Sequence, residues 1–246
     1  MTKWWIGCSG FYYKHWKELF YPSGLAQNKW FDYYCKYFNT LELNVTFYQF
    51  PRLKNLEEWY NKSPEDFAFS VKAPRAITHF KKFVETERMI SDFYAIIKEG
   101  LHNKLGVALF QLPPNYSYTE EKLDRILNNL NPEINNVLEF RHTSWWNINV
   151  YQKLSKHKIS FSGMSHPLLP EDIIDNTKNL YYRFHGVPFL YASEYDKVLL
   201  QKFCDEIITS GNTSNAYIYF NNDIGGSAIR NALFMKEYCN SLTFRK

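Results

Sequence analysis

The sequence predicts an α/β fold, a single (β/α)8 TIM barrel whose one domain spans residues 1–246. The length of 246 residues is close to the roughly 250 residues that such a barrel needs. Strand-like runs rich in aromatic and branched residues recur eight times along the chain. Helix-length stretches with apolar residues three and four apart separate most of these runs, and this alternation predicts parallel βα units. A doubly wound open sheet is the alternative fold.

The predicted strands follow one another from the first residues to the last quarter of the chain. They are Trp4–Gly10, Thr40–Tyr48, Phe67–Ala73, Leu105–Leu112, Asn136–Arg141, Lys158–Met164, Leu180–Gly186 and Ala216–Asn221.

The predicted helices lie between these strands, with Thr119 and Ser193 as candidate N-caps. They are Gln27–Tyr37, Leu53–Asn61, Phe83–Glu99, Thr119–Leu130, Val150–His157, Ser193–Ile208 and Ser227–Tyr238. The link between the sixth and seventh strands, Ser165–Asn179, carries prolines and acids but a poor helical period, so we predict it to be irregular.

Composition predicts a cytoplasmic protein and excludes several classes. The net charge of +4 permits an anionic ligand without indicating a polyanion-binding surface. The four cysteines lie far apart without a C-x-x-C pair, which predicts reduced core thiols and no zinc knuckle. No segment has the roughly 18 consecutive apolar residues of a membrane span, and we see no signal peptide, so no membrane partner is expected.

Polar side chains are predicted to face the inside of the barrel at its mouth. Side chains alternate between the two faces of a strand, so the apolar set of each strand shows which residues point the other way. Barrel enzymes build their sites from residues at the carboxyl ends of the strands. The inward polar residues predicted here are Glu42, Asn44, Lys72, Gln111, Glu139, Arg141, Arg183, His185 and Asn221.

Burying so many charged groups together is costly unless they pair with one another or meet a ligand. A purely structural explanation therefore stands beside the functional one: Glu139 with Arg183, or Glu42 with Lys72, would then form ion pairs that only hold the fold together. The number and convergence of these residues favour a functional site.

Seven motifs in order give the chain a resemblance to a known family. They are Gly7–Trp16 (GCSGFYYKHW), Glu42–Tyr48 (ELNVTFY), Val71–Arg75 (VKAPR), Phe110–Pro114 (FQLPP), Leu138–His142 (LEFRH), Tyr182–Gly186 (YRFHG) and Tyr219–Asp223 (YFNND). Together they resemble the YecE-like family, a domain of unknown function, over essentially the full chain. The resemblance implies a barrel related to the xylose isomerase and endonuclease IV type but supplies no reaction. Cys8 and Phe11 depart from the residues common in the family.

The function we predict is handling of an anionic ligand, phosphorylated or sugar-containing, in the barrel mouth; whether this includes catalysis stays open. Lys72, Arg141 and Arg183 would bind the negative charge, and Asn44, Gln111 and Asn221 would add polar contacts. Glu42 and Glu139 would act as acid and base, because two carboxylates in different surroundings can take opposite roles. His185 would carry a proton or orient the ligand.

Two alternatives belong to other classes. A binding module for nucleic acid or a phospholigand would stack bases or sugars on aromatic residues such as Tyr12, Tyr48 and Trp145. A metal-dependent phosphodiesterase like endonuclease IV would draw ligands from His185, Glu42, Glu139 and Asp223, but no H-x-H or H-E-x-x-H pair exists. The sequence leaves the cofactor and the oligomeric state open. We interpret His79 and His142 as loop histidines that bond to the backbone, and Lys14 and His15 as exposed.

Overall fold

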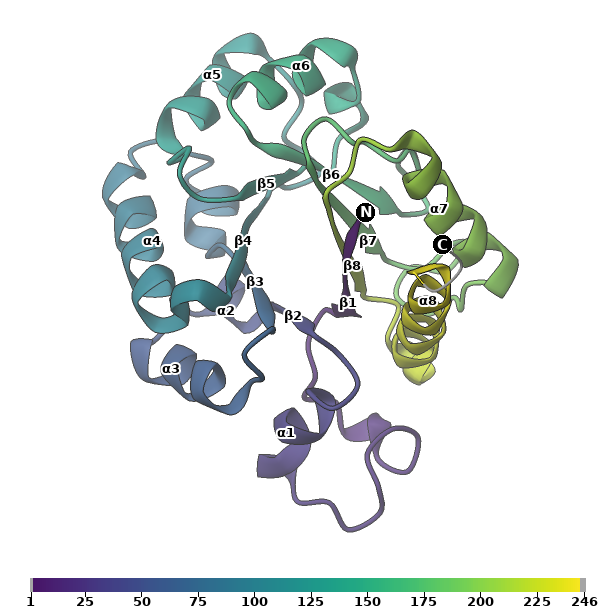
Figure 1. Cartoon of the computed structure of the whole chain (residues 1–246). Helices are drawn as coiled ribbons and strands as arrows, with labels where there is room; N and C mark the ends of the chain where they lie inside the picture. Colours follow the sequence, from purple (N-terminus) through teal and green to yellow (C-terminus); the bar gives the residue numbers. More distant parts are fainter. Residues whose placement is uncertain (1, 244–246) are drawn as a thin grey trace. The chain divides into compact units, whose positions relative to one another are not determined.

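The computed structural model describes residues 2–243 and shows eight strands that alternate with helices along the chain (Figure 1). The strand pairs whose registers are resolved are all parallel. The predicted (β/α)8 class is therefore confirmed. The strands are β1 (Lys3–Cys8), β2 (Thr40–Leu43), β3 (Ala68–Lys72), β4 (Leu105–Gln111), β5 (Asn136–Glu139), β6 (Ser160–Ser165), β7 (Asn179–Phe184) and β8 (Asn215–Phe220).

Seven of the helices follow the strands in the predicted order, and α2 lies within the second predicted strand. They are α1 (Trp30–Tyr34), α2 (Val45–Tyr48), α3 (Leu53–Lys62), α4 (Glu87–Leu101), α5 (Glu120–Asn129), α6 (Ile148–Lys156), α7 (Lys197–Ser210) and α8 (Ser227–Thr243). Among the described residues, the link between β6 and β7 contains no helix, which confirms the irregular segment predicted there. No helix within residues 2–243 is both long and apolar enough to cross a membrane.

The chain divides into two compact units. The first consists of Met1–Leu41 with Gly163–Lys246, and the second of Glu42–Ser162. In the first unit, β8 pairs with β1 on one side and β7 on the other, so that Tyr219 is in register with both Gly7 and Arg183. In the second unit, β4 pairs with β3 and β5. That the two units form one domain stays a prediction.

Each unit has its own aromatic core between strands and helices. In the second unit, Phe110 of β4 lies 5.9 Å from Phe93 and 6.0 Å from Tyr94 of α4, ring centroid to ring centroid. In the first unit, Phe184 of β7 stacks on Phe220 at 4.8 Å and contacts Phe203 of α7. Phe110 and Phe220 thus lie on the side of their strands opposite to the predicted inward residues Gln111 and Asn221, as the alternation of side chains requires.

The second predicted strand is wrong beyond Leu43. Asn44 adopts helical backbone angles, and Val45–Tyr48 forms the short helix α2. Val45 is half exposed. The Thr46 hydroxyl donates to the carbonyls of Leu43 and Lys72 at 3.0 and 2.6 Å, which fixes the helix against the end of β3. Asn44 is thus the residue before a helix, not an inward-facing strand residue.

One of the two predicted N-caps is also wrong. The Thr119 hydroxyl accepts a hydrogen bond from the Lys122 backbone and caps α5 as predicted. The helix expected from Ser193, however, begins at Lys197, and Asp196 caps it by accepting from the Val198 backbone N–H at 2.8 Å. Ser193 instead accepts from the Phe189 backbone within the preceding loop, and an aspartate is an equally good N-cap.

Candidate functional site

The second unit gathers charged side chains at the carboxyl ends of β3, β4 and β5. Lys72, the last residue of β3, has its ammonium 2.5 Å from Oε1 of Gln111, the last residue of β4. Lys72 is 8% exposed, and its Nζ lies 4.2 Å from the centroid of the Phe47 ring. The lysine is therefore held by an amide on one strand and by the face of an aromatic ring that follows β2.

The next strand adds a buried ion pair. Glu139 ends β5 opposite Gln111 in register, and its Oε1 accepts from Nε of Arg141 at 2.5 Å. The Glu139 side chain has no exposed surface and that of Arg141 is 9% exposed. Removing two charges from water costs free energy. The pair therefore either stabilises the fold as a structural ion pair or forms part of a ligand-binding site.

His79 joins this group from a π-helical turn, Ala76–Phe80, that follows β3. Its ring meets the Phe47 ring edge to face at 4.9 Å, and Nδ1 lies 2.9 Å from the Thr78 hydroxyl. Burial, followed by the charges of Lys72 and Arg141, lowers the pKa of His79 to about 4, against a smaller opposing effect of Glu139. The imidazole is therefore neutral at pH 7 beside two cations.

We define the residues Lys72, His79, Gln111, Glu139 and Arg141 as the β3–β5 cluster. The sequence pointed to four of them and missed His79. A histidine in a loop after a strand carries no local sign that its ring turns back toward the strand ends. The π-helical turn, an insertion often found at functional sites, was not visible in the residue pattern.

Aromatic residues beside the second unit's strand ends meet Arg75. Its guanidinium lies 5.6 Å from the ring centroid of Tyr48 and 5.3 Å from that of Phe80. Tyr48 is 66% exposed and Phe80 is 70% exposed, so each ring keeps a face open to solvent. Tyr48, one of the three aromatic residues predicted to stack on a ligand, therefore lies beside the Arg75 guanidinium and remains accessible.

The first unit holds a separate polar group at the ends of β7 and β8. His185 is fully buried, and its Nδ1 lies 3.1 Å from the Asn221 side-chain amide nitrogen. Because that nitrogen can only donate, Nδ1 accepts and a neutral His185 carries its proton on Nε2. Arg183, two residues before His185, is 1% exposed.

Asp223 lies just beyond this group and binds two residues that follow β1. Trp16 Nε1 donates to Oδ1 at 2.6 Å, and His15 Nε2 lies 2.7 Å from Oδ2. Burial raises the pKa of Asp223, while these two contacts lower it. His15 is exposed, as predicted, but it also forms this contact with Asp223.

Other predicted site residues have different surroundings. Trp145 has no exposed surface: it stacks on Phe140 at 3.9 Å and donates to the Tyr116 carbonyl at 2.6 Å. These contacts leave no ring face for a ligand, so Trp145 belongs to the core. Tyr12 is half exposed and donates to Gln27. Glu42 is completely buried in β2.

Within residues 2–243, no three His, Cys, Asp or Glu side chains come together in a group that could hold a metal ion. The described part of the chain therefore offers no ligand cluster for the metal-dependent phosphodiesterase considered as an alternative.

Comparisons with known proteins place the chain in a family. The model of the family described as "Protein of unknown function DUF72" matches residues 5–244. The chain is 30% identical to the UPF0759 protein YunF of Bacillus subtilis, over 89% of this chain and 90% of YunF. It is 27% identical to the UPF0759 protein YecE of Escherichia coli K12, over 46% and 42% of the two chains.

A solved structure covers nearly the whole chain. A DUF72 family protein from Thermotoga maritima superposes with a TM-score of 0.88 at 26% identity, over 97% of this chain and 99% of that one. The YecE-like resemblance of the seven motifs is thereby confirmed. The chain belongs to the DUF72 family.

Proposed function

We propose that the β3–β5 cluster binds a small anionic ligand, phosphorylated or sugar-containing, and exchanges a proton with it. The observation that supports this most is the position of His79: a neutral imidazole with a pKa near 4 beside the cations Lys72 and Arg141. Strongly perturbed groups of this kind gather at functional sites.

The two cations are suited to bind a phosphate or carboxylate group. Arg141 supplies a planar guanidinium and Lys72 a point charge, both at the ends of parallel strands, where α/β proteins bind their ligands. Glu139 already accepts a bond from Arg141, so a ligand anion would compete with this carboxylate or share the guanidinium with it. Gln111 orients Lys72 through its side-chain oxygen.

An anion bound to these cations would change the behaviour of His79. The charges of Lys72 and Arg141 are among the causes of its lowered pKa, and a negative ligand would offset them. The imidazole would then be a better proton acceptor with the ligand present than without it. Glu139 is the second candidate acid or base. The predicted catalytic roles of Glu42 and His185 stay predictions.

We expect sulfate, a mimic of a phosphate dianion whose charge stays constant between pH 4 and 8, to raise the pKa of His79 by about one unit or more. The bound state would then hold more protons than the free state between pH 4 and the new pKa. Sulfate affinity should therefore increase as the pH falls through that window. Histidine Cε1–H resonances followed by NMR at several pH values, with and without sulfate, would measure this.

The His79→Gln variant serves to assign the resonance and as a control. It should bind sulfate with little dependence on pH, because the titrating group is gone while Lys72 and Arg141 remain. If His79 titrates near pH 4 both with and without saturating sulfate, the anion does not bind beside it and the proposed site is wrong.

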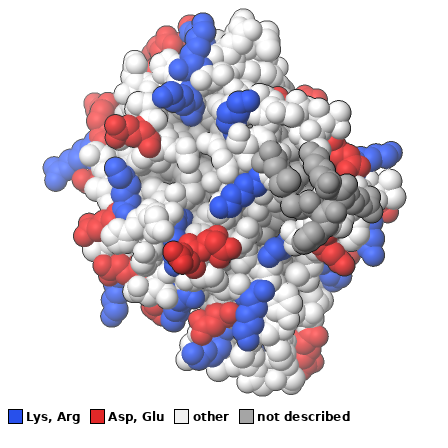
Figure 2. Space-filling model, viewed as in Figure 1, with Lys and Arg blue, Asp and Glu red and all other residues white. Residues whose placement is uncertain are grey.

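A non-catalytic nucleic-acid module is the second candidate, favoured by the contact of Arg75 with the exposed rings of Tyr48 and Phe80. Such rings can stack on bases. On the one face drawn in Figure 2, acidic and basic side chains are interspersed. On this hypothesis the affinity for a short single-stranded DNA should fall steeply as the salt concentration rises. The Arg75→Ala variant should bind the same DNA more weakly than the wild type. Absence of binding at low salt would exclude this candidate.

A further inference from the structure

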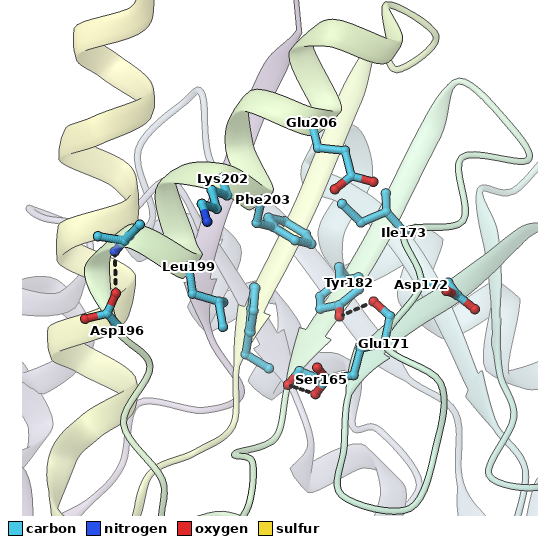
Figure 3. A pocket seen from close by; sticks show the side chains of 12 residues that line it. Ser165, Glu171, Asp172, Ile173, Tyr182, Asp196, Leu199, Lys202, Phe203 and Glu206 are labelled. Atoms are coloured by element: carbon cyan, nitrogen blue, oxygen red, sulfur yellow. Dashed lines mark hydrogen bonds between the residues drawn. The ribbon is translucent and has the colours of Figure 1, made fainter.

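The first unit contains a pocket of about 690 Å³ that the proposed function does not use (Figure 3). It lies between α7 and the irregular link that joins β6 to β7, with Tyr182 and Phe184 of β7 in its lining. Helices follow the other strands of the described chain, but residues 166–178 form none. The pocket therefore lies beside the one strand-to-strand link of the described chain that contains no helix.

One side of this pocket, which we call its floor, is apolar and aromatic. The Tyr182 ring lies 4.6 Å from the Phe203 ring of α7, and the Phe184 ring lies 5.0 Å from it, centroid to centroid. Leu199 of α7 and Ile173 of the link add aliphatic surface (Figure 3). Such a floor suits methylene groups or other apolar segments of a ligand.

The lining of the pocket is strongly acidic, in contrast to the chain as a whole. It contains the carboxylates Glu171, Asp172, Asp196 and Glu206 and the single ammonium of Lys202, whereas the whole chain has a net charge of +4. Figure 3 shows Glu171, Asp172 and Glu206 around Tyr182, and Asp196 with Lys202 toward the other end of the pocket.

The pKa of the Tyr182 phenol is shifted by the same acidic residues. Burial raises its pKa well above the ordinary value, and Glu171, Asp172 and Glu206 raise it further. Three carboxylates thus act together on one point of the pocket, in surroundings that are partly shielded from water. A positively charged ligand would gain from this arrangement more than from an isolated surface carboxylate.

A chain of hydrogen bonds holds one of these carboxylates in place. The Gly186 backbone N–H donates to the Tyr195 hydroxyl at 2.7 Å, and this hydroxyl donates to Ser165 Oγ at 2.8 Å. Ser165 Oγ donates in turn to Oε1 of Glu171 at 2.7 Å. The carboxylate is therefore positioned before any ligand arrives, which lowers the entropy cost of binding.

We propose that this pocket binds an aliphatic polyamine, with its methylene segments on the floor formed by Leu199 and Phe203 and its ammonium groups at Glu171, Asp172 and Glu206. The volume lies within the range of roughly 300–1,000 Å³ typical of small-molecule sites. Carboxylates beside an apolar floor match a flexible chain whose ammonium groups are separated by methylenes. A simple inorganic cation would match the charges but not the floor.

Calorimetric titration of the full chain with spermidine tests this proposal. In the double variant Asp172→Asn/Glu206→Gln, we expect roughly tenfold weaker binding, because two partly exposed charge contacts are lost. Leu199→Trp should abolish binding by filling the floor; Leu199 is nearly half exposed, so the larger side chain can be accommodated without disturbing the core. Glu99→Gln, an exposed acid of α4, is the matched control and should bind as the wild type does.

Two results would overturn the proposal. One is undiminished spermidine binding by both the double variant and Leu199→Trp, with unchanged melting temperatures showing that both variants fold. The other is binding of Mg²⁺ at equal ionic strength with the same affinity and the same loss in the double variant, which would show attraction of cations by charge alone. The double variant should bind sulfate as the wild type does, so failure of this proposal and failure of the β3–β5 cluster are distinguishable.

Discussion

Replacing Lys72 with Met is expected to weaken the binding of sulfate or of a phosphorylated ligand by roughly 100-fold. Lys72 is 8% exposed and its ammonium is held by Gln111, so the ligand would meet a cation that is already largely buried and fixed in position. Methionine is one atom shorter than lysine: it keeps most of the apolar stem but removes the charge and the ammonium that lies over Phe47. Isothermal titration at low salt measures the loss.

The control for this prediction is Lys54→Met, which removes one positive charge from an exposed position on α3 of the same unit. It should change the affinity little, because an exposed charge surrounded by water interacts weakly with a ligand that it does not contact. Equal affinities of Lys72→Met and the wild type would place the anion elsewhere and exclude Lys72 as its ligand.

The inward residues were predictable from the sequence because strand alternation has a simple period. The buried phenylalanines Phe110 and Phe220 identify the helix-facing side, so Gln111 and Tyr219 must point the other way. In the structure, the parallel pairing of β4 with β5 places Gln111 opposite Glu139. The strands of the fold follow from such local patterns, whereas their exact ends do not.

At the end of β2, the strand propensity of the residues does not predict the observed structure. Val45, Thr46, Phe47 and Tyr48 are strong β formers, so the run from Thr40 looked like one long strand. The chain turns at Asn44 instead, and the Thr46 hydroxyl finds the Lys72 carbonyl on a different strand. A contact of this kind depends on the tertiary structure, and no local sequence window contains it.

The role of His79 was unpredictable for a related reason. Its pKa depends on burial and on two cations from β3 and the end of β5, and none of these is a property of its own segment. The pocket beside α7 could not be predicted either. Prolines and acidic residues showed that the link after β6 is irregular, but the volume of the pocket depends on how α7 packs against Tyr182 and Phe184.

The Glu139→Gln variant separates a structural ion pair from a ligand site, the two explanations that the sequence left open. Without an added anion, the free energy of unfolding should fall by about 3 kcal/mol, because the guanidinium of Arg141 loses its buried countercharge. With sulfate present, part of this loss should be recovered, since a ligand that binds only the native state stabilises it. Urea unfolding with and without sulfate measures both values.

The comparison with Glu133→Gln, an exposed acid just before β5, removes the general stabilising effect of sulfate on proteins. If the cluster is a ligand site, sulfate should stabilise Glu139→Gln by more than it stabilises this control, and Lys72→Met should abolish the difference because the second cation is gone. Equal stabilisation of both variants would mean that no anion replaces the lost carboxylate. The ion pair of Glu139 and Arg141 would then have only a structural role, joining β5 to the loop that follows it. The next candidate for a ligand site would be the polar group around His185 and Asn221 in the other unit.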